Sequence, residues 1–252
     1  MNRLTASALA GSLFIASTAF ADPSAAEILK MADNAATCFK DLSIDSRMEI
    51  FEPGATTPRI ASMTTLTKGE KRLVRFTAPA DSKGMAMLLE TRDTMYVYLP
   101  GFQKVRRMGT HAKNQSFMGS DVSNEDMASQ TYSGVYQPKL IGSEGDNWLL
   151  DLTLLPGKEA EFPHLKMWVM KQHPNAVTRI DFFDDKGQLA KTQLRTNFSK
   201  DAGDGDHYTP AEITFIDHRR NDHKTVIHSS NAKVNQNLGD DLFSQRSLLR
   251  GQ

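Results

Sequence analysis

The sequence predicts a mainly β protein built on one strongly curled antiparallel sheet, or incomplete β-barrel. Three observations predict it. Short runs of alternating apolar and polar residues recur along the chain, turn residues separate these runs, and helix-like spacing is confined to a few segments. A long flat sheet of about a dozen strands is unfavourable and leaves reactive edges, so we expect it to curl. A curled sheet has an inner face that can line a cavity.

The first residues have the three parts of a secretory signal peptide. Arg3 supplies a positive charge, an apolar stretch runs from Leu4 to Phe20, and Ala19-Phe20-Ala21 is a small-x-small cleavage site. The alternative is a membrane anchor, which is disfavoured because hydroxyl residues interrupt the stretch. These residues are Thr5, Ser7, Ser12, Ser17 and Thr18. We therefore expect a signal peptide over residues 1–21, cleaved after Ala21, and export to the bacterial periplasm.

The mature chain, residues 22–252, is predicted to be one freely diffusing domain. A lipoprotein would need a cysteine at its new N-terminus, and the only cysteine, Cys38, lies inside the chain. We expect Cys38 to be a buried small side chain within a helix. Removing Arg3 from the 30 basic residues leaves 29 against 30 acidic ones, a balance that does not favour nucleic acid as a partner.

One helix and a series of hairpins are expected in the first half of the chain. Pro23 suits a helix start, and apolar residues at spacings of three and four continue to residue 40. From Leu42 the spacing changes to two, which predicts a strand that continues to about Ile50. Further strands are predicted at about 59–68, 70–78, 84–91, 94–99 and 102–108.

The strand pattern stops between residues 109 and 133. There, Ser123 followed by Glu125 and Asp126 is typical of a helix start, because a serine caps the first turn and early carboxylates favour it. Strands resume at about 135–143, 147–155, 164–171, 177–184, 188–198, 211–219 and 223–234.

Motifs for catalysis and metal binding are absent or weak. The sequence has no Gly-x-Ser-x-Gly, no phosphate-binding glycine loop and no His-Glu-x-x-His, so we expect neither enzyme activity nor a cofactor. The acidic loop 201–206 places glycines where an EF-hand needs oxygen ligands, which favours a solvated turn. His218 and His223 could meet across a hairpin, but their spacing is not that of a zinc site. We expect no bound metal.

Two small basic clusters could contact a lipid headgroup or an acidic partner. A solvated strand face is the alternative for both clusters. They are Lys104 with Arg106 and Arg107, and Lys224 with Arg219 and Arg220.

Methionine is frequent on the predicted strands, where β-branched residues are usual. Because its side chain is flexible and polarizable, methionine suits surfaces that accept variable apolar partners such as acyl chains, although ordinary core filling explains it equally well. These residues are Met48, Met63, Met85, Met87, Met95, Met108, Met167 and Met170.

One segment carries a specific motif. Ser116-Phe117-Met118-Gly119-Ser120-Asp121, followed by Asp126, resembles the SFMGSD-x-x-x-x-D signature of the LolA-like outer-membrane lipoprotein-sorting protein family. Asn124 departs from the family, which usually carries an aromatic residue there. Other matching segments are residues 76–84, 96–100, 104–107, 163–169, 184–187 and 237–244, so the resemblance spans nearly all of the mature chain.

The resemblance implies an incomplete, strongly curled β-barrel with helices covering its open side and an apolar cavity between them. It also implies a monomeric periplasmic carrier that shelters acyl chains of a lipid or lipoprotein without covalent chemistry. An inner-membrane transporter or an outer-membrane acceptor would be its partner. The residues expected to line this lipid cavity are Met48, Met63, Met85, Met87, Met95, Phe117, Met118 and Met167.

The signature loop, with Gly119, Ser120, Asp121 and Asp126, has a structural hypothesis of its own. Gly119 would permit close backbone approach, and Asp121 or Asp126 would cap the short helix. Phe117 and Met118 would pack beneath that helix as a cavity lid.

Two other functions stay open from the sequence. A periplasmic sensing or protein-interaction module could use the same fold without transferring lipid. A hydrolase would need a catalytic constellation that the sequence does not contain.

Overall fold

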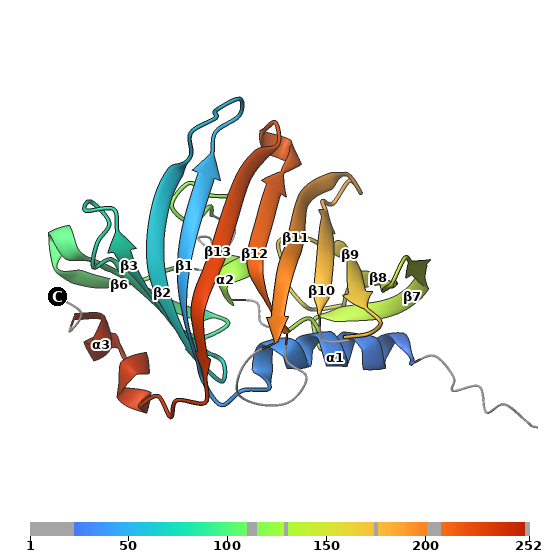
Figure 1. Cartoon of the computed structure of the whole chain (residues 1–252), viewed down its shortest axis with the longest axis horizontal. Helices are drawn as coiled ribbons and strands as arrows, with labels where there is room; N and C mark the ends of the chain where they lie inside the picture. The colour runs from blue at the N-terminus through green and yellow to red at the C-terminus, as the bar shows by residue number, and fades with distance from the viewer. Residues whose placement is uncertain (1–22, 110–114, 129–130, 174–175, 201–207, 250–252) are drawn as a thin grey trace, which may run out of the picture.

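The computed structural model describes residues 23–109, 115–128, 131–173, 176–200 and 208–249 (Figure 1). The predicted signal peptide and the acidic loop 201–206 lie outside these residues, so cleavage after Ala21 stays a prediction. Within the described part of the chain, no helix combines the length and the apolar character needed to cross a membrane.

Thirteen antiparallel strands form one sheet. The strands are β1 (Leu42–Phe51), β2 (Arg59–Lys68), β3 (Lys71–Ala78), β4 (Ala86–Thr91), β5 (Thr94–Leu99), β6 (Lys104–Arg107), β7 (Tyr136–Glu144), β8 (Asn147–Leu154), β9 (His164–Met170), β10 (Val177–Phe183), β11 (Leu189–Lys200), β12 (Tyr208–Asp217) and β13 (His223–Val234). The helices are α1 (Ala25–Thr37), α2 (Asn124–Ala128) and α3 (Gln245–Leu249), with short 3-10 turns η1 (Pro100–Phe102), η3 (His218–Arg220) and η4 (Asp240–Phe243). The predicted mainly β fold is confirmed.

The strand order is β6-β5-β4-β3-β2-β1-β13-β12-β11-β10-β9-β8-β7, and the sheet does not close on itself. The last strand returns to pair with the first, with Met48 opposite Ile227. As a result, β6 and β7 are consecutive in the sequence but lie at opposite edges of the sheet. The segment between them must therefore cross one face, and Figure 1 shows its helix α2 behind β13 and β12.

Helix α1 begins at a capping box. The Ser24 hydroxyl accepts a hydrogen bond from the Glu27 backbone N–H at 3.3 Å, and the Glu27 carboxylate accepts one from the Ser24 N–H at 2.8 Å. One face of the helix then buries Ile28 and Leu29 against the cluster formed by β7 to β10. The prediction for Cys38 was wrong: it lies just past the last helical residue and is exposed, because it falls outside the apolar face.

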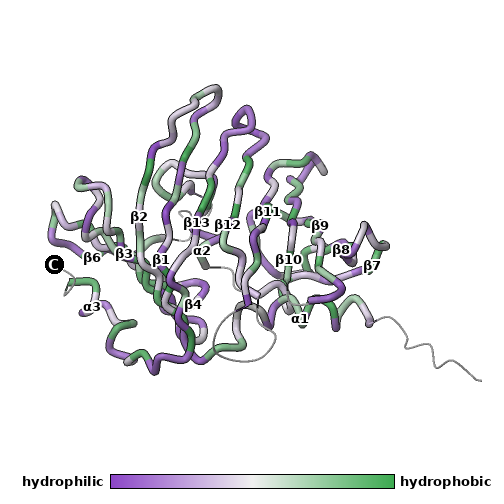
Figure 2. Tube along the Cα trace, in the orientation of Figure 1, coloured by the Kyte–Doolittle hydropathy of each residue, from purple (hydrophilic) through white to green (hydrophobic). Residues whose placement is uncertain are grey.

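Hydrophobic and hydrophilic residues are mixed along the strands of the sheet (Figure 2), and in β3, β4 and β5 apolar side chains are buried on both faces. One face carries Val74 and Phe76, which join the cluster containing Met48 and Met87. The other face buries Leu73, Ala86, Leu88 and Tyr98 beneath Phe243 and Leu248 from the C-terminal segment. The face that carries Val74 and Phe76, called the inner face below, contacts the crossing segment through Phe117. The C-terminal segment covers the opposite, outer face.

Candidate ligand cavity and the crossing segment

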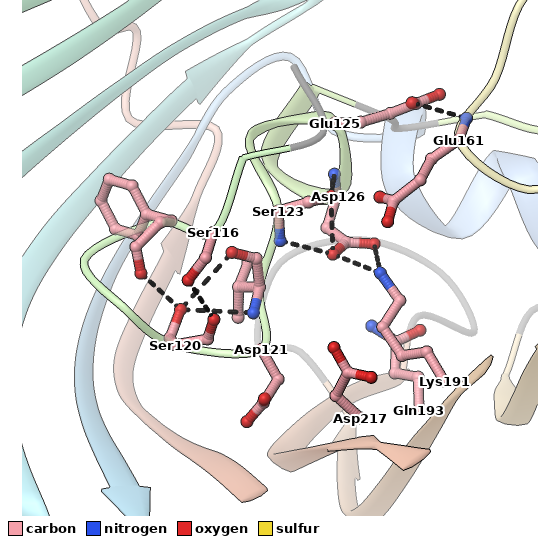
Figure 3. Close-up of polar contacts among 12 residues, drawn as sticks. Ser116, Ser120, Asp121, Ser123, Glu125, Asp126, Glu161, Lys191, Gln193 and Asp217 are labelled. Atoms are coloured by element: carbon pink, nitrogen blue, oxygen red, sulfur yellow. Dashed lines mark hydrogen bonds and ion pairs between the residues drawn. The ribbon is translucent and has the colours of Figure 1, made fainter. Parts of the chain in front are cut away.

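The residues that link β6 to β7 form the crossing segment, of which 108–109, 115–128 and 131–135 are described. Its signature loop is a tight hairpin in which Ser116 pairs with Ser123. The Phe117 N–H donates to the Val122 carbonyl at 2.7 Å, and the Ser120 hydroxyl donates to the Phe117 carbonyl at 2.6 Å (Figure 3). Gly119 adopts φ +75° at the tip, a conformation that glycine adopts without steric cost.

Asp121 fixes this hairpin to the sheet. Its carboxylate is fully buried and lies 2.7 Å from Nδ1 of His223, which is also buried. The Thr225 hydroxyl donates to the same carboxylate at 2.7 Å and accepts from the Asp121 N–H at 2.9 Å. Both partners lie on β13, at the centre of the sheet, so Asp121 is an anchor rather than a helix cap.

Helix α2 is capped by Ser123. The Ser123 hydroxyl accepts from the Asp126 N–H at 3.1 Å, and the Asp126 carboxylate accepts from the Ser123 N–H at 2.7 Å, which completes a capping box (Figure 3). The expectation of a serine-capped helix start is confirmed, and Asp126 supports the cap from the third helical position.

The same Asp126 carboxylate holds a buried lysine. Lys191 Nζ, on β11, lies 2.8 and 2.7 Å from the two carboxylate oxygens, and the lysine side chain is only 2 % exposed. The ammonium also lies over the rings of Phe162 and Phe182, at 5.0 and 4.6 Å from their centroids. A carboxylate and two aromatic faces therefore compensate a charge that burial alone would make costly.

Glu125 connects α2 to regions near both edges of the sheet. One carboxylate oxygen lies 3.2 Å from Nη2 of Arg92, in the β4–β5 turn. The other accepts from the backbone N–H of Glu161, between β8 and β9, at 2.9 Å. Arg72 on β3 adds a third tie, donating to the Met127 carbonyl at 2.5 Å.

A cavity of about 300 Å³ lies between the sheet and these covering elements. This volume is within the range of small-molecule sites. Its sheet side comes from β1, β2, β3, β10, β11, β12 and β13, and its cover comes from α1 and the crossing segment. Its apolar lining residues are Ala32, Phe39, Leu42, Ile44, Val122, Met127, Tyr132, Val177, Phe198, Tyr208, Pro210, Ile213, Phe215 and Ile227.

The residues predicted to line a lipid cavity lie in two packed hydrophobic clusters and not in the wall of the 300 Å³ cavity. Met48, Met63, Met87, Met95 and Phe117 are buried together, with Met85 and Met118 packed against them, and Met167 belongs to the cluster under α1. Phe117 also packs against Phe76, at 5.4 Å between ring centroids. The lining of the 300 Å³ cavity includes none of the eight, so a contact between them and an acyl chain stays a prediction.

Two half-buried arginines in the cavity wall were missed by sequence reasoning. Burial lowers the pKa of Arg72 to about 10 and also lowers the pKa of Arg195 from its ordinary value. Arg195 donates through Nε and Nη2 to the Gln193 side chain, at 3.3 and 3.0 Å. Burial also raises the pKa of Tyr132, near Arg195, to about 12. Arginines at alternating strand positions are common, so no sequence signal separated these two from surface residues.

A second hollow of about 260 Å³, lined mostly by polar and charged residues, lies beside the signature loop and contains Glu161, Asp217 and Arg219 in its wall. Burial raises the pKa of the Glu161 carboxyl above its usual range, against the opposing effects of Lys191 and Arg219. Arg219 pairs with Asp217 at 3.1 Å, and Arg220 lies 3.4 Å from Asp121. This basic cluster is thus partly neutralised, whereas Lys104, Arg106 and Arg107 on β6 are exposed.

The two histidines considered for a metal site have separate partners. His218 contacts Asp222 and the Thr192 hydroxyl, whereas His223 contacts Asp121. In the described residues, no three His, Cys, Asp or Glu side chains come together in a way that could hold a metal ion.

Solved structures share this architecture. A DUF1329 family protein from Desulfovibrio piger is 28% identical, with a TM-score of 0.80 over 89% of this chain and 98% of that one. A LolA superfamily protein from Nitrosomonas europaea is 24% identical, with a TM-score of 0.73 over 89% and 99% of the two chains. A protein from Vibrio parahaemolyticus, described as an outer membrane lipoprotein-sorting protein domain, is 22% identical, with a TM-score of 0.79 over 90% and 98%.

These likenesses define the class of fold as LolA-like, which confirms the resemblance carried by the signature loop. Residues 68–250 match the model of a family described as an uncharacterized protein, and the chain belongs to that family. No curated protein matches the sequence.

Proposed function

We propose that this protein is a periplasmic carrier that binds the acyl chains of a lipid or lipoprotein in its cavity and moves them between membranes. One observation carries the proposal: an apolar cavity of about 300 Å³ lies between a LolA-like sheet and a covering segment. An acyl chain gains about 0.8 kcal/mol for each CH₂ removed from water, so partition alone can drive binding. No catalytic group is needed.

The contacts of Glu125 support a strongly curled sheet around that cavity. On a flat sheet, eight strand spacings separate β4 from β9, or about 38 Å. Yet one Glu125 carboxylate contacts both Arg92, after β4, and Glu161, before β9. The meeting of two regions so far apart in the strand order at one side chain supports a sheet that bends toward the face on which the crossing segment lies.

Native mass spectrometry with lipid extraction tests the carrier proposal on the protein purified from its own periplasm. We expect bound lipid, together with transfer of that lipid between vesicles. Protein that is repeatedly empty and inactive in transfer would contradict the proposal. A stable protein partner in place of lipid would instead favour the sensing or interaction module.

A further inference from the structure

The cavity is apolar along most of its wall but contains two cationic side chains. Arg72 comes from β3 and Arg195 from β11, so they enter from opposite sides of the strands β2, β1, β13 and β12. Both lie near the crossing segment, because Arg72 binds the Met127 carbonyl and Arg195 is close enough to influence Tyr132 electrostatically. Two positive groups therefore lie near one region of the cavity.

No described carboxylate forms an ion pair with either arginine. The cavity lining contains two carboxylates, Asp33 and Asp126, and both have other partners. Asp33 accepts from the backbone N–H groups of Tyr132 and Ser133, at 2.8 and 2.7 Å. Asp126 binds Lys191. Asp126 is near enough to Arg195 to act on it electrostatically, but its carboxylate is already paired with Lys191, so neither arginine has an ion-pair partner among the residues described.

Hydrogen-bond donors also remain unused. Nε of Arg72 is buried and has no hydrogen-bond partner among the described residues. Among the described residues, the acceptor of Arg195 is the neutral Gln193 amide. An arginine carries five N–H donors, and leaving a charged donor buried without an acceptor is unfavourable. A ligand that brings an anionic oxygen into the cavity would satisfy both the donors and the charge.

We propose that the cavity binds an amphiphile with an acidic end group, a carboxylate or a phosphate, whose chain lies on the apolar wall and whose anionic oxygens contact Arg72 and Arg195. This inference rests on the proposed carrier function and narrows its cargo. The acyl chains of a lipoprotein anchor end in neutral ester and amide groups, which cannot neutralise a guanidinium. An acidic lipid can.

The test is displacement of a neutral apolar dye, N-phenyl-1-naphthylamine, from the delipidated mature chain. Hexadecanoate, hexadecyl phosphate and the neutral hexadecan-1-ol have the same chain length and differ in the end group. We expect the acids to displace the dye at concentrations about tenfold or more below that of the alcohol. Comparing the two acids shows whether carboxylate or phosphate is the preferred form, and inorganic phosphate alone should displace nothing.

Arg195→Met and Arg72→Met should reduce the preference for acids over the alcohol to within about threefold. Each change replaces a charged hydrogen-bond donor by an uncharged, unbranched side chain. Arg47→Met, at an exposed position on β1, is the matched control and should keep the full preference. Because Arg72 also holds the Met127 carbonyl, Arg72→Lys is included as a variant that retains the charge, and circular dichroism checks folding of each protein.

The outcomes separate the two proposals. If the dye binds but the alcohol displaces it as well as the acids do, the inference of an acidic end group is wrong and the carrier proposal stands. The same holds if both Arg→Met variants keep the full preference. If neither the dye nor any amphiphile binds the wild-type chain, both proposals fail.

Discussion

Nζ of Lys191 lies 2.7 Å from Oδ2 of Asp126, and this nearly buried ion pair joins the middle of the crossing segment to β11. Removing one partner of a buried pair leaves the other charge uncompensated, which typically costs about 3–5 kcal/mol. We predict that Asp126→Asn lowers the free energy of unfolding by about 3 kcal/mol in urea denaturation.

Two further variants check the cause. Adding Lys191→Met to Asp126→Asn should restore much of the lost free energy of unfolding, because the double variant no longer contains the unpaired buried ammonium group. Asp185→Asn, in an exposed turn, should change stability by no more than about 0.5 kcal/mol. Equal effects of Asp126→Asn and Asp185→Asn would show that the pair contributes nothing.

Gly119 and Gly54 offer a matched comparison at the signature loop. Both have positive φ, +75° and +76°, so alanine should cost roughly 1–2 kcal/mol at either position. Only at Gly119 would the new Cβ meet a neighbour, Nη2 of Arg59 at 3.0 Å, which donates to the Met118 carbonyl at 2.8 Å.

We therefore predict that Gly119→Ala is the more destabilising change by about 1 kcal/mol, the worth of one such hydrogen bond. Urea unfolding of both variants measures the gap. In an Arg59→Ala background the gap should disappear, and a gap that persists there would rule out Arg59 as its cause.

Glu161 should make stability depend on pH. Burial raises its pKa in the folded protein above the ordinary 4.5, so the folded state holds the proton more tightly than the unfolded state does. The resulting stabilisation is fully present below pH 4.5 and is lost as the pH rises through the folded pKa. It amounts to about 1.4 kcal/mol for each unit of the rise in pKa.

Glu161→Gln removes this dependence because glutamine does not titrate. Relative to the wild type, the variant should become more stable as the pH is raised from 4.5 to 8, measured by urea unfolding at each pH. A difference between the two proteins that stays constant over this range would mean that Glu161 has the same pKa folded and unfolded.

Filling the cavity should block ligand binding. Ile213 lines the cavity from β12, and Ile213→Trp places a larger side chain there. We predict at least a tenfold weaker affinity for N-phenyl-1-naphthylamine, equivalent to losing roughly two buried methylene contacts. Ile141→Trp, at an exposed position on β7, should bind the dye as the wild type does. Unchanged binding by Ile213→Trp would place the dye elsewhere.

Much of the fold could be predicted from the sequence because hydrophobic period is a local property. The strand predicted at 59–68 and that at 223–234 match β2 and β13 to the residue. The strand predicted from 211 begins earlier, at Tyr208, because Pro210 pairs with Phe198 inside the ladder. A proline lacks an N–H and is usually excluded from strand interiors, so the sequence pattern alone favours a strand start after Pro210.

The site could not be predicted in the same way because its contacts join distant parts of the chain. Asp126 and Lys191 are 65 positions apart, and nothing in the local pattern of β11 distinguishes Lys191 from a solvated lysine. Ala190, Lys191, Thr192 and Gln193 are all buried, so this stretch lacks the alternation that identified other strands. The methionines were found by composition, which indicates an apolar interior but not which wall faces the cavity.

The strand order has a mechanical consequence for the crossing segment. The crossing segment continues into β6 at one edge of the sheet and into β7 at the other. It is therefore held in place at both of its ends. A segment held at both ends cannot rotate away from the sheet about a single hinge. Under the proposed carrier function, a ligand that enters past this segment displaces it sideways or spreads the two edges of the sheet that it joins, so opening on this side is coupled to the bending of the sheet, whereas α1 covers another part of the cavity.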